Sequence, residues 1–230
     1  SSVTTPTFPT AWLDEGPLSR DRSVSLWEHR TKVSSFHWEI APSSLQVREM
    51  LGKGGFGTVY RAKWMGTDVA VKIVESEDMT SDDYREFLSE ISMMSNLRHP
   101  NVLILLGGSL APPNLYFVTE YMRQGSLDKV LQAYPHLDWR VKLSMSIEMA
   151  RGLYYLHHQS PPILHRDLKS LNILVDENFH VKVADFGLSA DKTEHLKMKM
   201  GTLNWVAPEC FGVEGNVYDE KADMWSFGMI

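Results

Sequence analysis

Three polar residues in the second half of the chain have the side-chain types that chemistry on a phosphate requires. Asp167 and Asn172 lie in the polar segment 165–172, and Asp185 follows the short apolar strand expected at 181–183. Together they offer carboxylate and amide oxygens, the ligands that Mg²⁺ prefers, and a carboxylate that can act as a base. Because Mg²⁺ commonly shares its coordination with substrate phosphates, the pattern predicts a magnesium-dependent phosphate site.

A run of glycines in the first half of the chain has the spacing of a phosphate-binding turn. Gly52, Gly54 and Gly57 lie in the sequence GKGGFG, and Val59 follows in a β-branched segment. Glycine has no Cβ, so the backbone N–H groups of such a turn can approach a phosphate closely. A dinucleotide-binding fingerprint would open a helix at this point, whereas this pattern predicts a hairpin between two strands.

A lysine and a glutamate in the same half have the positions of an internal ion pair. Lys72 lies on a strand predicted at 68–74, and Glu90 lies on a helix expected to begin near residue 81. On that helix Phe87 and Met94 form an inward apolar stripe, and the spacing places Glu90 on the same face. A buried carboxylate is costly without a partner, and Lys72 is the nearest candidate cation in sequence.

The elements that position these residues follow from hydrophobic periodicity. The first half predicts strands at 45–51, 58–62, 68–74, 102–106 and 115–118 around the single helix. Gly125 ends this strand-rich part. A long amphipathic helix follows, marked by Leu143, Ile147, Ala150, Tyr154 and His157, and strand-like segments at 173–175 and 181–183 flank the polar residues.

Composition limits the function classes. The chain has 230 residues, is 43% hydrophobic and carries a formal net charge of −6, which does not favour a nucleic-acid binder. The single cysteine, Cys210, excludes an intrachain disulfide and favours a cytoplasmic location. No apolar run is long enough to span a membrane. Residues 1–37 are rich in Ser, Thr and Pro and predict a linker or tail.

Taken in order, these motifs resemble the protein kinase catalytic domain. The glycine turn, Lys72 and Glu90 are followed by His165-Arg166-Asp167, Asp185-Phe186-Gly187 and Ala207-Pro208-Glu209. The residues of the motifs are similar to those of the tyrosine-kinase-like group of Ser/Thr kinases, which includes the Raf and mixed-lineage kinases. The similar stretches are WEI at 38–40, HRDLKSLN at 165–172 and GTLNWVAPE at 201–209.

The resemblance covers residues 38–230 and implies a bilobal α+β fold. It places a small antiparallel N-lobe sheet with one main helix at about 38–118, a hinge at 119–124 and a mostly helical C-lobe at 125–230. The chain ends within an apolar helix that begins near Asp223, a residue that would brace the catalytic loop. The C-lobe is therefore expected to be incomplete, and residues 1–230 are expected to be a fragment with little stability or activity alone.

The resemblance also implies an ATP site. Gly52, Gly54 and Gly57 would cover the phosphates of ATP, while Lys72, kept in place by Glu90, would hold the α- and β-phosphates. The remaining implied contacts are with the adenine: Leu51, Val59, Ala70 and Leu174 would enclose the ring, Glu120 and Met122 would be hinge residues, and Thr119 would be the gatekeeper.

The implied reaction is transfer of the γ-phosphate of ATP to a Ser or Thr hydroxyl of a protein substrate. Asp167 would accept the hydroxyl proton, and Lys169 would neutralise the γ-phosphate. Asn172 and Asp185 would ligate Mg²⁺. Two alternatives stay open: a pseudokinase-like nucleotide-binding scaffold, and an inactive truncated fragment. If a receptor region precedes Ser1, the domain would lie on the cytoplasmic side of a membrane.

Activation-loop phosphorylation is the mode of regulation that Arg166, directly before Asp167, suggests by the same resemblance. The loop offers Ser189, Thr193 and Thr202, and Thr202 is similar to a threonine that supports the catalytic aspartate. We therefore predict that Thr193→Ala lowers phosphotransfer, because a phosphate there would order the loop through an arginine. Undiminished activity of this variant in a kinase assay would contradict the hypothesis.

Overall fold

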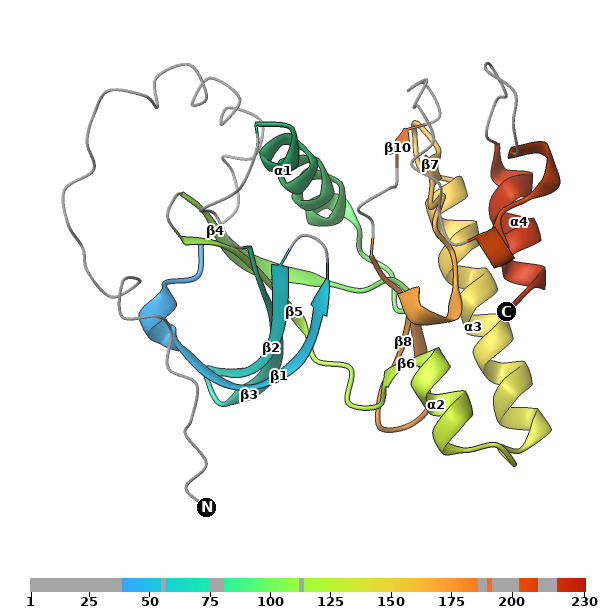
Figure 1. The fold of residues 1–230 in the computed structure, drawn as a ribbon, viewed down its shortest axis with the longest axis horizontal. Helices are drawn as coiled ribbons and strands as arrows, with labels where there is room; N and C mark the ends of the chain where they lie inside the picture. The colour runs from blue at the N-terminus through green and yellow to red at the C-terminus, as the bar shows by residue number, and fades with distance from the viewer. Residues whose placement is uncertain are drawn as a thin grey trace. The chain divides into compact units, whose positions relative to one another are not determined.

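The computed structural model describes residues 39–54, 57–74, 81–111, 114–185, 190–191, 203–210 and 219–230. The chain divides into two compact units, which we describe separately (Figure 1). The first comprises Ser1–Ser92 and Leu105–Tyr121, and the second comprises Met93–Ile104 and Met122–Ile230.

A five-stranded antiparallel sheet lies in the first unit. Its strands are β1 (Leu45–Gly54), β2 (Gly57–Trp64), β3 (Thr67–Ile73), β4 (Leu105–Ala111) and β5 (Asn114–Glu120). They lie in the order β1-β2-β3-β5-β4, so β3 is the central strand. This places Lys72 between two neighbouring strands that fix its backbone on both sides.

The two faces of this sheet have different contents. One face carries the hydrophobic core, in which Ala62, Val69, Val71, Tyr116 and Val118 are fully buried. Alternate residues of the same strands point to the opposite face, because side chains alternate along a strand. That opposite face carries the charged residues of β2 and β3, namely Arg61, Lys63, Asp68 and Lys72.

Gly57 makes the start of β2 possible. Its φ is +139°, and a Cβ at this position would lie 2.1 Å from the carbonyl oxygen of Ile73. Only glycine accommodates both constraints. The predicted hairpin is present, since β1 pairs with β2 from Leu45 opposite Trp64 to Gly54 opposite Gly57.

The helix predicted to begin near residue 81 is α1 (Ser81–Asn96). Phe87 and Met94 are buried as expected, and Glu90 is buried with them at 6% exposure. The helical periodicity was therefore a sound guide to the direction of this carboxylate.

The second unit combines helices α2 (Leu127–Ala133), α3 (Trp139–His157) and α4 (Glu220–Gly228) with short strands. Strands β6 (Gly125–Ser126), β8 (Ile173–Val175) and β9 (Val181–Val183) form one sheet, and β7 (Ile163–Leu164) pairs with β10 (Ala190–Asp191). The segment between β7 and β8 carries Asp167 and Asn172, so the two small sheets fix both ends of this polar segment.

The prediction of a strand at 102–106 is wrong in its bounds. The strand of the first unit, β4, begins only at Leu105. Val102 and Leu103 instead lie beside β9, where Val102 forms a bridge with Val183 and the Leu103 N–H donates to the Val183 carbonyl at 2.9 Å. Their apolar character serves the packing of the second unit, which a strand pattern alone does not distinguish.

The predicted long helix is present as α3, but the residues that mark it in the sequence do not form its buried side. Leu143, Ile147 and Tyr154 are exposed at 48%, 46% and 65%. The buried side is formed by other residues: Met145, Met149, Leu153 and Leu156. Both sides of this helix are apolar, so periodicity did not decide which side packs against β9 and β7.

The predicted α+β class is confirmed, with an antiparallel sheet and one main helix in the first unit and a mostly helical second unit. The predicted tail at 1–37 and the loop that contains Thr193 lie outside the described residues. Within the described ranges, no helix is both long and apolar enough to cross a membrane.

Gly152 on α3 provides a test of packing in the second unit. A Cβ there would lie 2.5 Å from the Asn101 carbonyl oxygen and 2.9 Å from the Val183 side chain. Although alanine favours helix, we expect Gly152→Ala to lower the free energy of unfolding by about 1–3 kcal/mol, because the site is overpacked. Thermal and denaturant unfolding of the full chain measure this.

The matched control is Gly228→Ala on α4, where a Cβ meets nothing within 4 Å. We expect this variant to be as stable as the wild type or slightly more stable. Equal stabilities for the two glycine variants would contradict the packing described around Gly152.

Candidate functional site

Lys72 and Glu90 form the expected ion pair in the first unit. The Lys72 Nζ lies 3.2 Å from Oε2 and 3.4 Å from Oε1 of Glu90. The side chains are 19% and 7% exposed, and the Lys72 Nζ also lies 5.2 Å from the centre of the Phe117 ring. Breaking such a buried pair is costly, because one charge would lose its compensation. The amine is thus held in a defined place on the strand.

Strand register places the expected adenine-contacting residues on the face that carries Lys72. Val59 lies opposite Lys72, and Ala70 lies opposite Thr119. Residues directly opposite one another in an antiparallel pair point to the same face. Leu51, on β1, is half-buried. The structure therefore groups Val59, Ala70 and Thr119 on one side of the sheet, away from the core.

The expected hinge residues continue from the end of β5. The Thr119 hydroxyl donates to the Glu120 carbonyl at 3.3 Å. Met122 begins the second unit, where it is buried and its carbonyl accepts from the Gly125 N–H at 3.0 Å. Leu174 is half-buried on β8, between the fully buried Ile173 and Val175.

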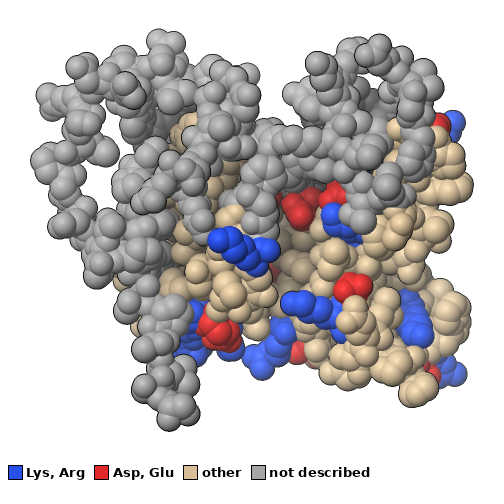
Figure 2. Space-filling view, in the orientation of Figure 1, with Lys and Arg blue, Asp and Glu red and all other residues tan. Residues whose placement is uncertain are grey.

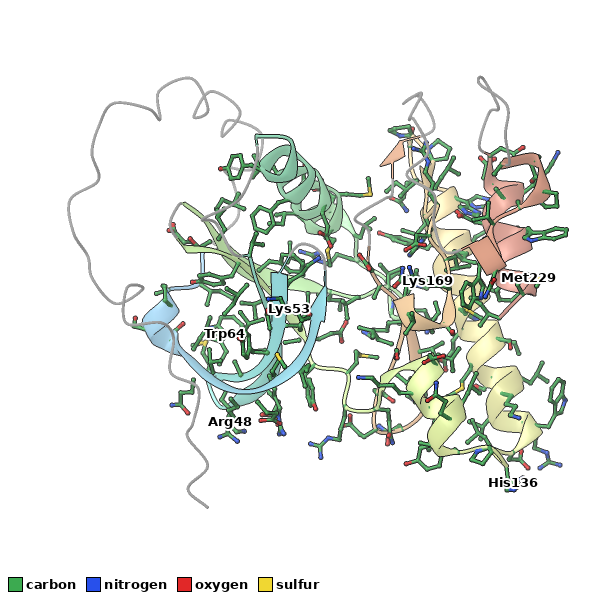
Figure 3. The ribbon with its side chains drawn as sticks, in the orientation of Figure 1. Arg48, Lys53, Trp64, His136, Lys169 and Met229 are labelled. Atoms are coloured by element: carbon green, nitrogen blue, oxygen red, sulfur yellow. The ribbon has the colours of Figure 1, made fainter. Side chains whose placement is uncertain are left out.

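The polar segment between β7 and β8 gathers its reactive side chains around Asp167. Lys169 Nζ lies 2.6 Å from Asp167 Oδ2, and the Asn172 side-chain amide donates to the same oxygen at 3.0 Å. The Asn172 amide also donates to the Asp167 carbonyl at 2.8 Å. The side chain of Lys169 is labelled in Figure 3. Both donors converge on one carboxylate oxygen, which fixes the orientation of the carboxylate.

Asp223 on α4 fixes the backbone of this segment. Its Oδ2 accepts from the His165 N–H at 2.8 Å, and its Oδ1 accepts from the Arg166 N–H at 2.9 Å. The His157 Nε2 lies 2.8 Å from Oδ2. Burial acts to raise the pKa of Asp223. The hydrogen bond from His157, the charge interaction with the His165 ring and the hydrogen bonds from the His165 and Arg166 amides outweigh burial, so the pKa lies below its usual value.

Two residues of the site have strained backbones. Arg166 has a φ of +66° and Asp185 a φ of +63°, in the left-handed region that favours glycine. Strain of this kind persists where surrounding contacts determine the conformation, and it gathers at functional sites. At Arg166 the determining contact is the hydrogen bond to Asp223.

Asp185 follows β9 and is tied to the same segment through its neighbour. The Ala184 N–H donates to the Asn172 carbonyl at 2.9 Å, and the Ala184 carbonyl lies 2.9 Å from His165 Nε2. These contacts hold the end of β9 against the segment that carries Asp167 and Asn172. The structure thus brings the three polar residues predicted from the sequence into one part of the second unit.

The donor set fits a magnesium ion shared with a substrate. The Asn172 amide nitrogen is engaged by Asp167, so its Oδ1 is the atom suited to a cation, and Asp185 adds a carboxylate. In the described part of the chain, no cluster of three or more His, Cys, Asp or Glu side chains could hold a metal ion by itself. Mg²⁺ that is bound together with a nucleotide usually takes one or two ligands from the protein and further oxygen ligands from the phosphates.

Charge on the described surface is mixed rather than concentrated. Figure 2 shows basic and acidic side chains interspersed over the face in view. With a net charge of −6 for the whole chain, attraction for phosphate must come from local groups. Lys72 and Lys169 are the lysines that the structure ties to Glu90 and Asp167.

Sequence reasoning missed His157 as a partner of Asp223. The two residues are 66 positions apart, and His157 was read only as part of a helix stripe. It also missed Glu148, whose Oε2 accepts the Val181 N–H at 2.8 Å and so supports β9 ahead of Asp185. Neither contact has a local pattern in the sequence that would reveal it.

Comparison with known proteins identifies the relatives of this chain. Residues 45–230 match the family described as protein tyrosine and serine/threonine kinase. The chain is 47% identical over 198 residues to serine/threonine-protein kinase CTR1 of Arabidopsis thaliana, which covers 84% of this chain and 24% of that protein.

Two further relatives come from other lineages. The probable serine/threonine-protein kinase drkA of Dictyostelium discoideum is 45% identical, with 84% of this chain and 30% of that protein covered. A putative serine/threonine-protein kinase/receptor, R826, of Acanthamoeba polyphaga mimivirus is 40% identical, with 87% and 12% covered. The chain thus spans less than a third of the length of each of these relatives.

These matches confirm the resemblance to a protein kinase catalytic domain of the tyrosine-kinase-like group. They agree with the geometry, in which a buried Lys–Glu pair and an Asp–Lys–Asn cluster occur at the motif positions. The chain belongs to the protein tyrosine and serine/threonine kinase family.

Proposed function

We propose that this chain is the catalytic domain of a protein kinase that transfers the γ-phosphate of ATP to Ser and Thr hydroxyls of protein substrates. The observation that carries the proposal is the cluster around Asp167, in which Lys169 and Asn172 both contact Oδ2. Family membership and the names of the relatives support the reaction class. Little covalent chemistry is required of the protein, so positioned charge accounts for most of the catalysis.

Asp167 would accept the proton of the substrate hydroxyl. Because Lys169 and Asn172 both contact Oδ2, Oδ1 is the oxygen oriented to take this proton. The backbone that carries Asp167 is fixed by Asp223 through its two neighbours. A base held in this way loses little entropy when the substrate arrives, which is the benefit of preorganisation.

Binding of the nucleotide would use the first unit and the hinge. Lys72, oriented by Glu90, would neutralise the α- and β-phosphates beneath Gly52, Gly54 and Gly57. The adenine would lie against a set of apolar and hinge residues, namely Leu51, Val59, Ala70, Thr119, Glu120, Met122 and Leu174. This assignment is supported by the strand register, which puts Val59, Ala70 and Lys72 on the same face of the sheet.

Mg²⁺ would be held by Asn172 and Asp185. When bound, it supplies positive charge to the phosphate oxygens at which negative charge develops during transfer. Lys169 would add a second positive group from the protein, and its contact with Asp167 places it beside the proposed base. A lysine at this position also favours Ser and Thr acceptors by resemblance to kinases of that type.

The hinge at 119–124, the cytoplasmic location and a protein substrate are part of the same proposal. The single cysteine supports a reducing compartment.

Asp167→Asn should strongly lower phosphotransfer without preventing ATP binding. The variant keeps the size of the side chain but removes the base, which should lower kcat by about 10²–10⁴-fold. Intact mass of the full chain before and after incubation with Mg-ATP, together with a binding titration, measures both properties. The matched control is Asp128→Asn on α2, where Asp128 accepts only a side-chain hydrogen bond from Gln132 among the described contacts.

Phosphate added by wild type and by Asp128→Asn, but not by Asp167→Asn, would support the kinase. A folded wild-type chain that binds ATP and adds no phosphate would contradict it and favour the two alternatives, a nucleotide-binding scaffold or an inactive truncated fragment.

Glu90→Gln should weaken catalysis through Lys72. Loss of the negative charge weakens the 3.2 Å contact that holds the amine, and misplacement by about 1 Å can lower the rate by about a hundredfold. We expect kcat/KM for ATP to fall to this extent. Glu39→Gln, which changes an exposed carboxylate of the same unit, is the control and should keep the wild-type value. Equal kcat/KM values for both variants would refute the assigned role of Glu90.

A further inference from the structure

Arg61 forms a charged cluster that the proposed reaction does not use. It lies on β2, and its guanidinium contacts a carboxylate on each neighbouring strand. One nitrogen lies 2.9 Å from Glu49 Oε1 on β1, and another lies 2.8 Å from Asp68 Oδ2 on β3. The same guanidinium lies 5.0 Å from the centre of the Tyr121 ring, within the range of a cation–π interaction.

The cluster lies on the face of the sheet proposed to bind the nucleotide. Arg61 is opposite Ala70, and Ala70 is opposite Thr119, so the three side chains point to the same side. The hydrophobic core lies on the other side of the sheet. Arg61 is therefore not an element of the core, and its position is at the end of the face nearest the hinge.

The guanidinium is more firmly fixed than an ordinary surface cation. Isolated surface ion pairs contribute little, because two mobile side chains must be ordered for one contact. Here one side chain serves three partners, and Arg61 and Asp68 are only 23% and 19% exposed. The hydrogen bond from Arg61 lowers the pKa of the Asp68 carboxyl, and Asp68 in turn raises the pKa of Arg61. The two carboxylates thus set the plane of the guanidinium that contacts the Tyr121 ring.

Tyr121 is the residue through which this cluster reaches the hinge. It stands directly between Glu120 and Met122, the residues whose backbone is proposed to pair with the adenine edge. The residue is half-buried. Because the allowed rotamers of a side chain depend on the backbone angles, a side chain held by Arg61 leaves fewer backbone conformations open to Tyr121. A hinge that is ordered before ATP arrives loses less entropy on binding.

We propose that Arg61 is a positioning residue of the nucleotide site, which fixes the Tyr121 ring and thereby the hinge backbone. This inference rests on the proposed function. It assigns Arg61 no contact with ATP, and it places the effect in nucleotide affinity rather than in the chemical step.

The experiment measures the Kd of Mg-ATP by calorimetric titration of the full chain, alongside KM and kcat. Arg61→Met removes the cation and Tyr121→Leu removes the aromatic ring, and each leaves an apolar side chain. We expect Kd and KM for ATP to rise about fivefold in each, with kcat within about twofold of wild type. The double variant should be no weaker than either single variant, because both remove the same contact.

Two controls separate positioning from stability. Tyr121→Phe keeps the ring and should keep most of the wild-type affinity. Lys63→Met removes another β2 cation, one that lies 3.5 Å from Asp68 Oδ1, and should leave Kd unchanged. Melting temperatures of all variants show whether any loss of affinity is only a loss of folded protein.

Unchanged Kd in Arg61→Met and Tyr121→Leu, or additive losses in the double variant, would overturn the proposal. A wild-type chain that binds ATP but transfers no phosphate would refute the proposed function, and the Kd values would still decide the role of Arg61. Failure of the folded wild type to bind Mg-ATP would overturn both.

Discussion

The buried carboxylate of Asp223 is the constraint on which the second unit depends. It accepts hydrogen bonds from the backbone amides of His165 and Arg166, and it lies 2.8 Å from the His157 ring. A charge with no exposure to solvent is tolerated only with such partners. The same bonds hold Arg166 in a left-handed conformation that would otherwise be unfavourable. Asp167 is the next residue along the chain. Its position therefore depends on the hydrogen bonds that Asp223 accepts from His165 and Arg166.

Similar logic governs the first unit, where charges are fixed by partners on other elements. Lys72 is oriented by Glu90 from α1, and Arg61 is oriented by carboxylates on β1 and β3. In each case the charged group lies on the face of the sheet opposite the core. Phosphoryl transfer requires positioned charge more than reactive bonds, and both units supply charge that is ordered in advance. The structure therefore accounts for function through the partners of the reactive groups as much as through the groups themselves.

Local patterns predicted those features whose cause is local. Helical spacing placed Glu90 on the buried side of α1, and the glycine pattern predicted the β1–β2 hairpin. Patterns failed where the deciding partner is distant. The strand pattern predicts Val102 on a strand of the first half of the chain, but Val102 bridges Val183. The apolar residues that mark α3 in the sequence include the exposed Leu143, Ile147 and Tyr154, because both sides of this helix are apolar. The His157–Asp223 contact spans 66 positions and has no local signature. The site residues themselves come from the motif resemblance and stay a prediction.

Amide hydrogen exchange at the catalytic loop tests most directly the claim that Asp223 fixes the site. The measurement compares the full wild-type chain with Asp223→Asn, following a peptide that contains the His165 and Arg166 amides and a peptide from β1–β3 as reference. We expect slow exchange of the loop amides in the wild type, faster exchange in the variant, and equal exchange in the reference peptide. Equal exchange of the loop amides in both proteins would show that the Asp223 carboxylate does not hold this backbone.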